Sequence, residues 1–145
     1  MITGFNHTGI VVQDLEKMES FYTEAIGLNV LRRIDSVAPP EGDHTGVPGA
    51  RRTLLFVGIA NDHQIELVHY IEPPARAGYL DKHQFGATHV CFDVEDLRQT
   101  YAELAAKDVR FVTEPKFRDV DGNTVGVVYA RDPEGNWLEF IQGLK

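Results

Sequence analysis

The chain has 145 residues, of which 43% are hydrophobic and 25% charged, and its formal net charge is −8 at pH 7. This composition indicates a soluble protein with a real core, built as one domain or as two small modules that share one. The negative charge and the lack of any Lys/Arg cluster exclude a nucleic-acid surface. Because Cys91 is the single cysteine and no leader or membrane span is evident, we expect a cytoplasmic protein with no disulfide and no membrane partner.

The first half of the chain predicts the order β-α-β-β-β. Its helix begins at Asp14, a favourable N-cap, carries apolar residues at helical spacing and ends near Gly27. Residues 37–49 are rich in Pro, Gly and charge, which predicts a loop long enough to close over a site. Asn61 and Asp62 predict the turn between the last two strands. The predicted strands are 5–12, 29–35, 51–59 and 63–70.

The same order begins again after the break at Pro73-Pro74. Asp96 is the predicted cap of a second helix, with Gln99 three residues on as a weak capping box. Asp132-Pro133-Glu134-Gly135 suits a turn that launches the last strand. The predicted organisation is therefore module one (1–72), a linker (73–84) and module two (85–145). The predicted strands of module two are 87–94, 109–113, 124–130 and 137–141, with a turn at 121–123.

Equivalent residues of the two halves keep a constant spacing. His7 and His89 are 82 residues apart, and so are the two helix-capping Asp residues. Glu66 and Glu139 are only 73 residues apart, so module one carries nine extra residues, which the loop 37–49 can accommodate. An internal duplication explains all of these spacings with one assumption.

Each module places one His on its first strand and one Glu among aliphatic residues on its last strand. A lone His or Glu on a strand is more often packed or solvated, since a carboxylate among apolar neighbours is costly to bury unless it is paired. Four such residues at repeat-equivalent positions instead predict convergence in one concavity: His7, Glu66, His89 and Glu139. Nitrogen and oxygen donors without thiolate suit Ni²⁺, Co²⁺, Mn²⁺, Fe²⁺ or Zn²⁺ and leave two octahedral positions open. The other histidines are expected to face solvent: His44, His63, His69 and His83.

Two further residues are candidates for the site. Arg52 is either an exposed strand residue or a clamp for a substrate carboxylate or phosphate, through paired guanidinium hydrogen bonds. Cys91 lies two residues after His89 and therefore on the same strand face, where we expect a small core residue.

Taken together, these motifs resemble the vicinal oxygen chelate superfamily, which includes glyoxalase I, methylmalonyl-CoA epimerase and the extradiol dioxygenases. The resemblance covers residues 2–142 and is carried by N-H-T-G-I-V-V, I-E-L, T-H-V-C-F-D-V and D-P-E-G-N-W-L-E-F-I. It implies an α+β fold in which two tandem β-α-β-β-β modules form a half-open barrel around one divalent metal ion. It also implies a homodimer. The metal ligands that match the family pattern are His7, Glu66, His89 and Glu139.

The resemblance implies a lyase or isomerase that chelates a small anionic or polar substrate through adjacent oxygens, with Glu66 or Glu139 moving a proton. The alternatives are a ring-cleaving extradiol-type dioxygenase, which uses two His and one Glu, and a non-enzymatic resistance-type binding protein. Val11 and Tyr70 stand where glyoxalase I has Arg and Asn for glutathione. Arg52 stands where the epimerases have a second base. We therefore expect neither of those two substrates to be used well.

Overall fold

The computed structural model describes residues 1–60, 63–76, 78 and 80–144, which fall into two compact units, 1–78 and 79–145. The predicted turn at Asn61-Asp62 lies outside the described residues. The first unit contains β1 (His7–Val12), α1 (Leu15–Ser20), η1 (Phe21–Ala25), β2 (Asn29–Val37), β3 (Arg51–Gly58) and β4 (Gln64–Glu72). The second contains β5 (His89–Asp93), α2 (Leu97–Ala105), β6 (Arg110–Phe111), β7 (Lys116–Val120), β8 (Asn123–Arg131) and β9 (Trp137–Gln142).

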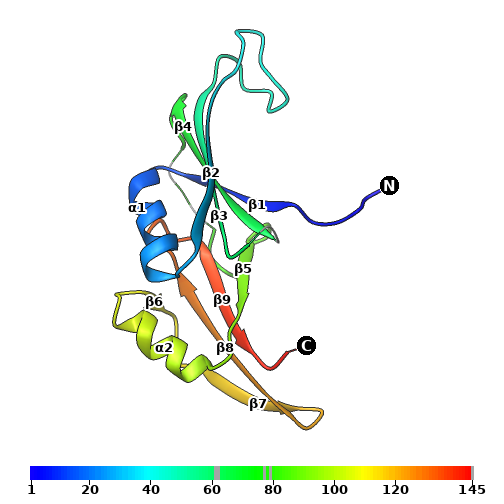
Figure 1. The fold of residues 1–145 in the computed structure, drawn as a ribbon, viewed down its shortest axis with the longest axis vertical. Helices are drawn as coiled ribbons and strands as arrows, with labels where there is room; N and C mark the ends of the chain where they lie inside the picture. Colours follow the sequence, from blue (N-terminus) through cyan, green and yellow to red (C-terminus); the bar gives the residue numbers. More distant parts are fainter. Residues whose placement is uncertain (61–62, 77, 79, 145) are drawn as a thin grey trace. The chain divides into compact units, whose positions relative to one another are not determined.

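Each unit is one mixed sheet with a helix against one face (Figure 1). The strand order is β1-β4-β3-β2 in the first unit and β5-β9-β8-β6 in the second, where β7 also pairs with β8. In both sheets the first strand runs parallel to the last, and the remaining pairs are antiparallel. The α+β class and the β-α-β-β-β repeat are therefore confirmed.

The first helix begins as predicted but changes its geometry half way. Asp14 caps α1 by accepting a hydrogen bond from the Lys17 backbone N–H at 3.0 Å. After Ser20 the chain continues as the π-helical turn η1, in which the Ile26 N–H donates to the Phe21 carbonyl at 3.1 Å. Gly27 then takes φ +89°, the left-handed conformation that ends the helix. The side chains buried by this segment are Leu15, Met18 and Tyr22.

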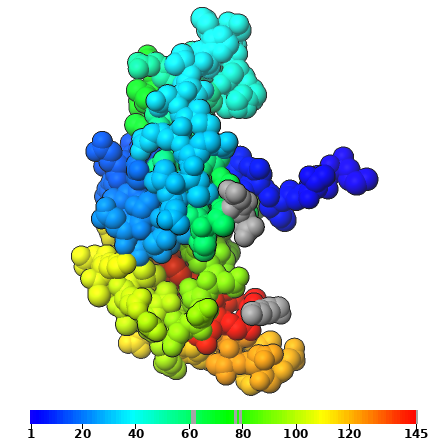
Figure 2. All heavy atoms as spheres, viewed as in Figure 1, coloured from blue at the N-terminus to red at the C-terminus, as the bar shows by residue number. Residues whose placement is uncertain are grey.

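The loop between β2 and β3 projects from the end of the first sheet and is held at its base by backbone hydrogen bonds (Figure 2). The Ala38 N–H donates to the Ala50 carbonyl at 2.7 Å, and the Gly49 N–H donates to the Pro39 carbonyl at 3.0 Å. Ala38 and Ala50 are both buried. The nine extra residues of the first half therefore form a closed loop that is anchored on the sheet edge.

The second sheet corrects the predicted strand at 109–113. The edge of β8 is covered in two pieces, β6 and β7, and Pro115 lies between them. Because proline has no N–H to donate to a ladder, the edge strand is interrupted there. The turn predicted at 121–123 is present at Asp121-Gly122, but strand β7 before it was not predicted. These two residues have φ +52° and +80°, as expected for the two-residue hairpin loop that Asp-Gly favours.

Helix α2 covers the face of the second sheet that carries its apolar residues. Asp96 accepts hydrogen bonds from the Arg98 and Gln99 N–H groups at 2.9 and 3.0 Å. The Gln99 side chain donates to Glu103, so in the described contacts it does not complete the predicted capping box. No helix in the described part of the chain is long and apolar enough to cross a bilayer. The aromatic core on this face includes Phe92, Phe111 and Phe140.

The turn that precedes β9 is confirmed, and it is organised by a buried carboxylate. Asp132 is 1% exposed and accepts hydrogen bonds from the Glu134 N–H at 3.0 Å and the Asn136 N–H at 2.9 Å. The Asn136 side-chain amide also donates to it, at 2.7 Å. These bonds orient the first residues of β9, whose register with β8 places Glu139 opposite Tyr129.

Candidate metal centre

In the first unit, a histidine and a glutamate lie side by side on neighbouring parallel strands. His7 on β1 places its Nε2 3.2 Å from the Oε2 of Glu66 on β4. Phe56 on β3 pairs with Glu66, and its ring meets the imidazole of His7 edge-on with centroids 5.6 Å apart. The guanidinium of Arg32 lies 4.2 Å above the same ring. Both members of the pair keep access to solvent, with side chains 36% and 15% exposed.

The second unit repeats this arrangement. His89 on β5 places its Nε2 3.0 Å from the Oε2 of Glu139 on β9. Tyr129 on β8 pairs with Glu139, and its ring meets the imidazole of His89 edge-on at 5.4 Å. A cation again lies on the aromatic ring, here the ammonium of Lys82, 2.6 Å from the centroid. The structure thus brings His7 to Glu66 and His89 to Glu139, each pair on equivalent strands.

The spacing within each pair suits two ligands of one metal ion. Two donor atoms bound at about 2.1 Å and at right angles are about 3.0 Å apart. The observed separations of 3.2 and 3.0 Å match this edge, and each pair offers one nitrogen and one oxygen. Among the described residues, no group of three or more His, Cys, Asp or Glu lies close enough to hold a metal. Each unit therefore contains half of the predicted four-ligand set.

The surroundings of the two glutamates differ. Glu139 lies between Cys91 on β5 and Tyr129 on β8, its partners on the two neighbouring strands. Partial burial, followed by the charge of Glu139, raises the pKa of Cys91 to about 11 and also raises the pKa of Tyr129. The residue beside Glu66 is Gly9, where a Cβ would lie 3.5 Å from the carboxylate. Cys91 is exposed, so its prediction as a small core residue is wrong.

Lys82 is a site residue that the sequence analysis missed. It lies in the predicted linker, yet its ammonium contacts the rings of Tyr129 and Trp137. Burial lowers the pKa of Lys82, and the nearby charge of Glu139 opposes that shift. The Trp137 indole N–H donates to the Leu80 carbonyl at 2.9 Å, which holds this segment on the second sheet. A lysine in an irregular segment carries no local signal of such a position.

Arg52 is buried, with 3% of its side chain exposed. Its guanidinium forms an ion pair with Asp43 of the loop 38–50 and donates hydrogen bonds to Thr45 and Ser36, both at 3.0 Å. The expectation of an exposed strand residue is therefore wrong. A substrate anion would have to displace Asp43 to reach this guanidinium, so the clamp stays a prediction from the sequence.

The remaining histidines lie away from the two pairs. His44 and His83 are exposed, and so is His63, whose Nε2 is 2.7 Å from the Thr8 hydroxyl. His69 is half-buried and pairs with Val12 and Thr53, on the face of the first sheet opposite Glu66.

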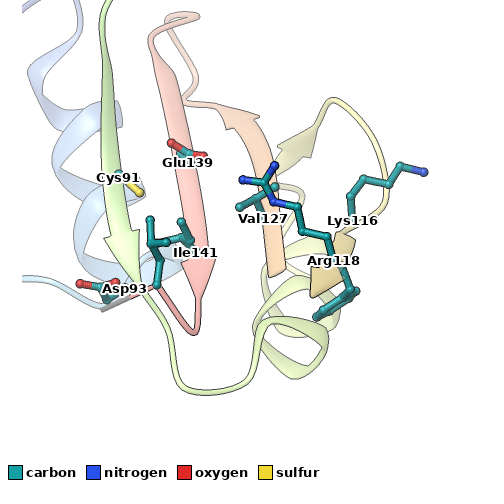
Figure 3. Close-up of a pocket in the computed structure, with 9 residues that line it drawn as sticks. Cys91, Asp93, Lys116, Arg118, Val127, Glu139 and Ile141 are labelled. Atoms are coloured by element: carbon teal, nitrogen blue, oxygen red, sulfur yellow. The ribbon is translucent and has the colours of Figure 1, made fainter. Parts of the chain in front are cut away.

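A groove of about 650 Å³ lies along the second sheet beside Glu139 (Figure 3). One wall is formed by β5 and β9, and the other by β8 and the edge strand β7 that the sequence analysis missed. The Asp-Gly hairpin signal could have revealed β7, because such a turn requires a strand on each side. The lining residues used below are Cys91, Asp93, Lys116, Arg118, Val127 and Glu139.

Residues 4–140 match the family model described as "Glyoxalase/Bleomycin resistance protein/Dioxygenase superfamily", and the chain belongs to this superfamily. It is 30% identical to a probable lactoylglutathione lyase of Synechocystis sp., over 94% of this chain and 92% of that protein. It is 31% identical to the human mitochondrial methylmalonyl-CoA epimerase, over 94% of this chain and 72% of that one. A glyoxalase family protein from Bacillus cereus has the same fold, with a TM-score of 0.84 at 23% identity, covering 100% of this chain and 97% of that one.

Proposed function

We propose that this protein is a divalent-metal-dependent lyase or isomerase that transfers a proton on a small substrate with two adjacent oxygens. The observation that carries the proposal is the pair of equivalent His–Glu contacts, His7 with Glu66 and His89 with Glu139, each spaced as neighbouring metal ligands. The similarity to proteins named as a lyase and as an epimerase supports this reaction class. Bound to these four residues, a divalent metal would act as a Lewis acid toward the substrate oxygens.

The two glutamates are suited to different tasks. Glu139 has Tyr129 and Cys91 as its cross-strand neighbours, and both side chains carry a proton that can be donated to a carboxylate. Glu66 has Gly9 and Phe56 in the equivalent positions, and neither side chain can donate a hydrogen bond to it. We therefore assign proton transfer to Glu66, whose carboxylate is the less constrained of the two, and a fixed ligand role to Glu139.

The metal assignment is tested by measuring metal content and affinity in single variants. Purified protein is stripped with a chelator and titrated with Ni²⁺, Co²⁺, Mn²⁺, Fe²⁺ and Zn²⁺. Glu139→Gln and His89→Ala should each weaken binding of the preferred metal at least about tenfold, because even changes behind a ligand cost that much. Glu72→Gln is the matched control, since Glu72 is an exposed carboxylate on the same strand as Glu66.

The Glu66→Gln variant separates the proposed reaction class from its main alternative. If four ligands hold the metal, Glu66→Gln weakens binding as Glu139→Gln does. Unchanged affinity in Glu66→Gln alone would leave two His and one Glu, the ligand set of ring-cleaving dioxygenases, and would overturn the proposal. Unchanged metal affinity in Glu139→Gln, His89→Ala and Glu66→Gln would refute the assignment of a metal site to these residues. The metal-to-chain ratio, measured together with the molecular mass, shows how many chains build one site.

A further inference from the structure

The groove on the second unit combines an apolar floor with charged ends. The strand register aligns Lys116, Val127, Ile141 and Asp93 in one row across β7, β8, β9 and β5. Tyr129, Glu139 and Cys91 form the next row. Directly paired residues share a face of the sheet, and all members of the first row line the groove, as do Glu139 and Cys91 of the second row. Glu139 therefore belongs both to the proposed metal centre and to the wall of the groove.

Arg118 is the cation that points into this groove. Figure 3 shows its side chain running from β7 across β8, with the guanidinium directed toward the strand of Glu139. In the same view Lys116 extends away from Glu139, and Ile141 lies between Arg118 and Asp93. Arg118 thus approaches the proposed site across the apolar surface of Val127.

No other described side chain neutralises Arg118. Other arginines of this protein have partners: Arg52 pairs with Asp43, and Arg131 with Asp81. Arg98 lies 4.1 Å above the ring of Phe117, on the opposite face of β7. Neither Arg118 nor Lys116 forms a hydrogen bond or ion pair in the described part of the chain. The β7 side of the groove thus presents two cations, Lys116 and Arg118, in a protein of net charge −8.

We propose that Arg118 binds an anionic group of the substrate, a carboxylate, at the end of the groove away from Cys91, with Lys116 at its rim. The inference rests on the proposed function, because it places the adjacent oxygens of the same substrate at Glu139. A guanidinium offers two parallel N–H donors that match a carboxylate, and the apolar floor accommodates the carbon chain between the two ends. The substrate class is thus a 2-hydroxy or 2-oxo acid with a second carboxylate.

The test uses probes that share one chelating group and differ in the second charge. Lactate, malate and 2-hydroxyglutarate each carry an α-hydroxycarboxylate, but only the last two have a further carboxylate, on chains of different length. In metal-loaded protein, malate or 2-hydroxyglutarate should bind at least tenfold more tightly than lactate. Arg118→Ala should weaken binding of malate and 2-hydroxyglutarate about ten- to hundredfold, the effect of losing one charge-assisted contact. Its affinity for lactate should stay within twofold of that of the parent protein. Arg110→Ala is the matched control, an exposed arginine on the neighbouring edge strand β6 that does not line the groove.

A metal-free arm separates this inference from the proposed function. Glutarate, which has two carboxylates and no chelating hydroxyl, is titrated into metal-free protein while amide NMR signals are followed. Shifts on β7 and β8 that Arg118→Ala abolishes support the anion site, even if the metal titrations have failed. A preference for the dicarboxylates that survives Arg118→Ala overturns the inference. So does the absence of glutarate-induced shifts along the groove.

Discussion

Arg52 and Asp132 are the two charged side chains that are almost fully buried in the described residues, and each one organises an irregular segment. Asp132 satisfies the N–H groups of the turn before β9. Arg52 binds Asp43, Thr45 and Ser36, which fixes the loop 38–50 to β2 and β3. Its Nε is the one buried side-chain polar atom among the described residues without a hydrogen-bond partner. A buried charge is tolerated here because the loop that covers it also neutralises it.

The Asp43 contacts predict an acid-sensitive contribution to stability. Hydrogen bonds from the Thr45 hydroxyl and backbone N–H, together with Arg52, hold the pKa of Asp43 well below its usual range, against the effect of burial. A depressed folded-state pKa stabilises the fold above the unfolded value of about 3.9, and this contribution is lost as the pH falls below it. Asp43→Asn should therefore lower the free energy of unfolding at pH 7, and its difference from the parent should shrink below about pH 4.

Urea unfolding of both proteins at pH 7, 5, 4 and 3 measures this difference. Asp121→Asn is the control, because its backbone has φ +52°, a conformation that asparagine also accepts, and the residue is exposed. A gap between the parent and Asp43→Asn that stays constant from pH 7 to pH 3 would mean that Asp43 does not hold the loop as a carboxylate.

At the scale of elements, the edge strand β7 carries Arg118 and depends on one glycine for its packing. Gly126 on β8 pairs with Phe117, and a Cβ there would lie 2.6 Å from the Phe117 ring and 2.9 Å from Leu97 on α2. Both neighbours belong to the core between α2 and the sheet. The absence of a side chain at Gly126 therefore allows β7 and α2 to approach β8 together.

Gly126→Ala should destabilise the protein by about 1–3 kcal/mol, the usual cost of overpacking a well-filled core. Urea unfolding gives the change in the free energy of unfolding, and the amide signals of β7 show whether the edge strand has shifted. Gly4→Ala is the control, since nothing lies within 4 Å of a Cβ at that residue. A loss below about 0.5 kcal/mol, typical of surface substitutions, would show that Phe117 and Leu97 move aside without cost.

At the scale of the whole molecule, the chain shares its superfamily and much of its length with a probable lactoylglutathione lyase and a methylmalonyl-CoA epimerase. It differs from the patterns expected of such enzymes at residues that would contact the substrate. By the family resemblance, Val11 and Tyr70 stand where residues that contact glutathione are expected. Arg52 replaces the expected second base of the epimerases, and Asp43 occupies its guanidinium. The anion site proposed at Arg118 favours a small dicarboxylate as the substrate instead.

We therefore expect the glutathione hemithioacetal of methylglyoxal and methylmalonyl-CoA both to be poor substrates of the metal-loaded protein. Steady-state assays at verified metal content measure kcat/KM for each, with an active lactoylglutathione lyase and an active epimerase assayed in the same buffers. An efficiency of about 10⁵ M⁻¹s⁻¹ or more with either substrate, inside the usual enzyme range, would contradict this expectation.

Local chemistry made much of the fold predictable from the sequence alone. Asp14 and Asp96 cap the two helices because short acceptor side chains satisfy N–H groups only two or three residues away. The offset between His7 and His89 revealed the duplication, and with it the strand that each ligand candidate occupies. Alternation along β9 then placed Glu139 on the face opposite Leu138 and Phe140.

Contacts between residues distant in sequence were decided only by the tertiary structure. Arg52 is paired because a loop nine residues earlier returns over β3, and Lys82 lies on Tyr129 because the segment before β5 packs on β8 and β9. β7 completes the wall of the groove because β8 still has a free edge beyond the interruption at Pro115. Caps and strand alternation are properties of neighbouring residues and can be read from the sequence. The partner of a buried charge, or of an open sheet edge, depends on which distant segment fills the space beside it.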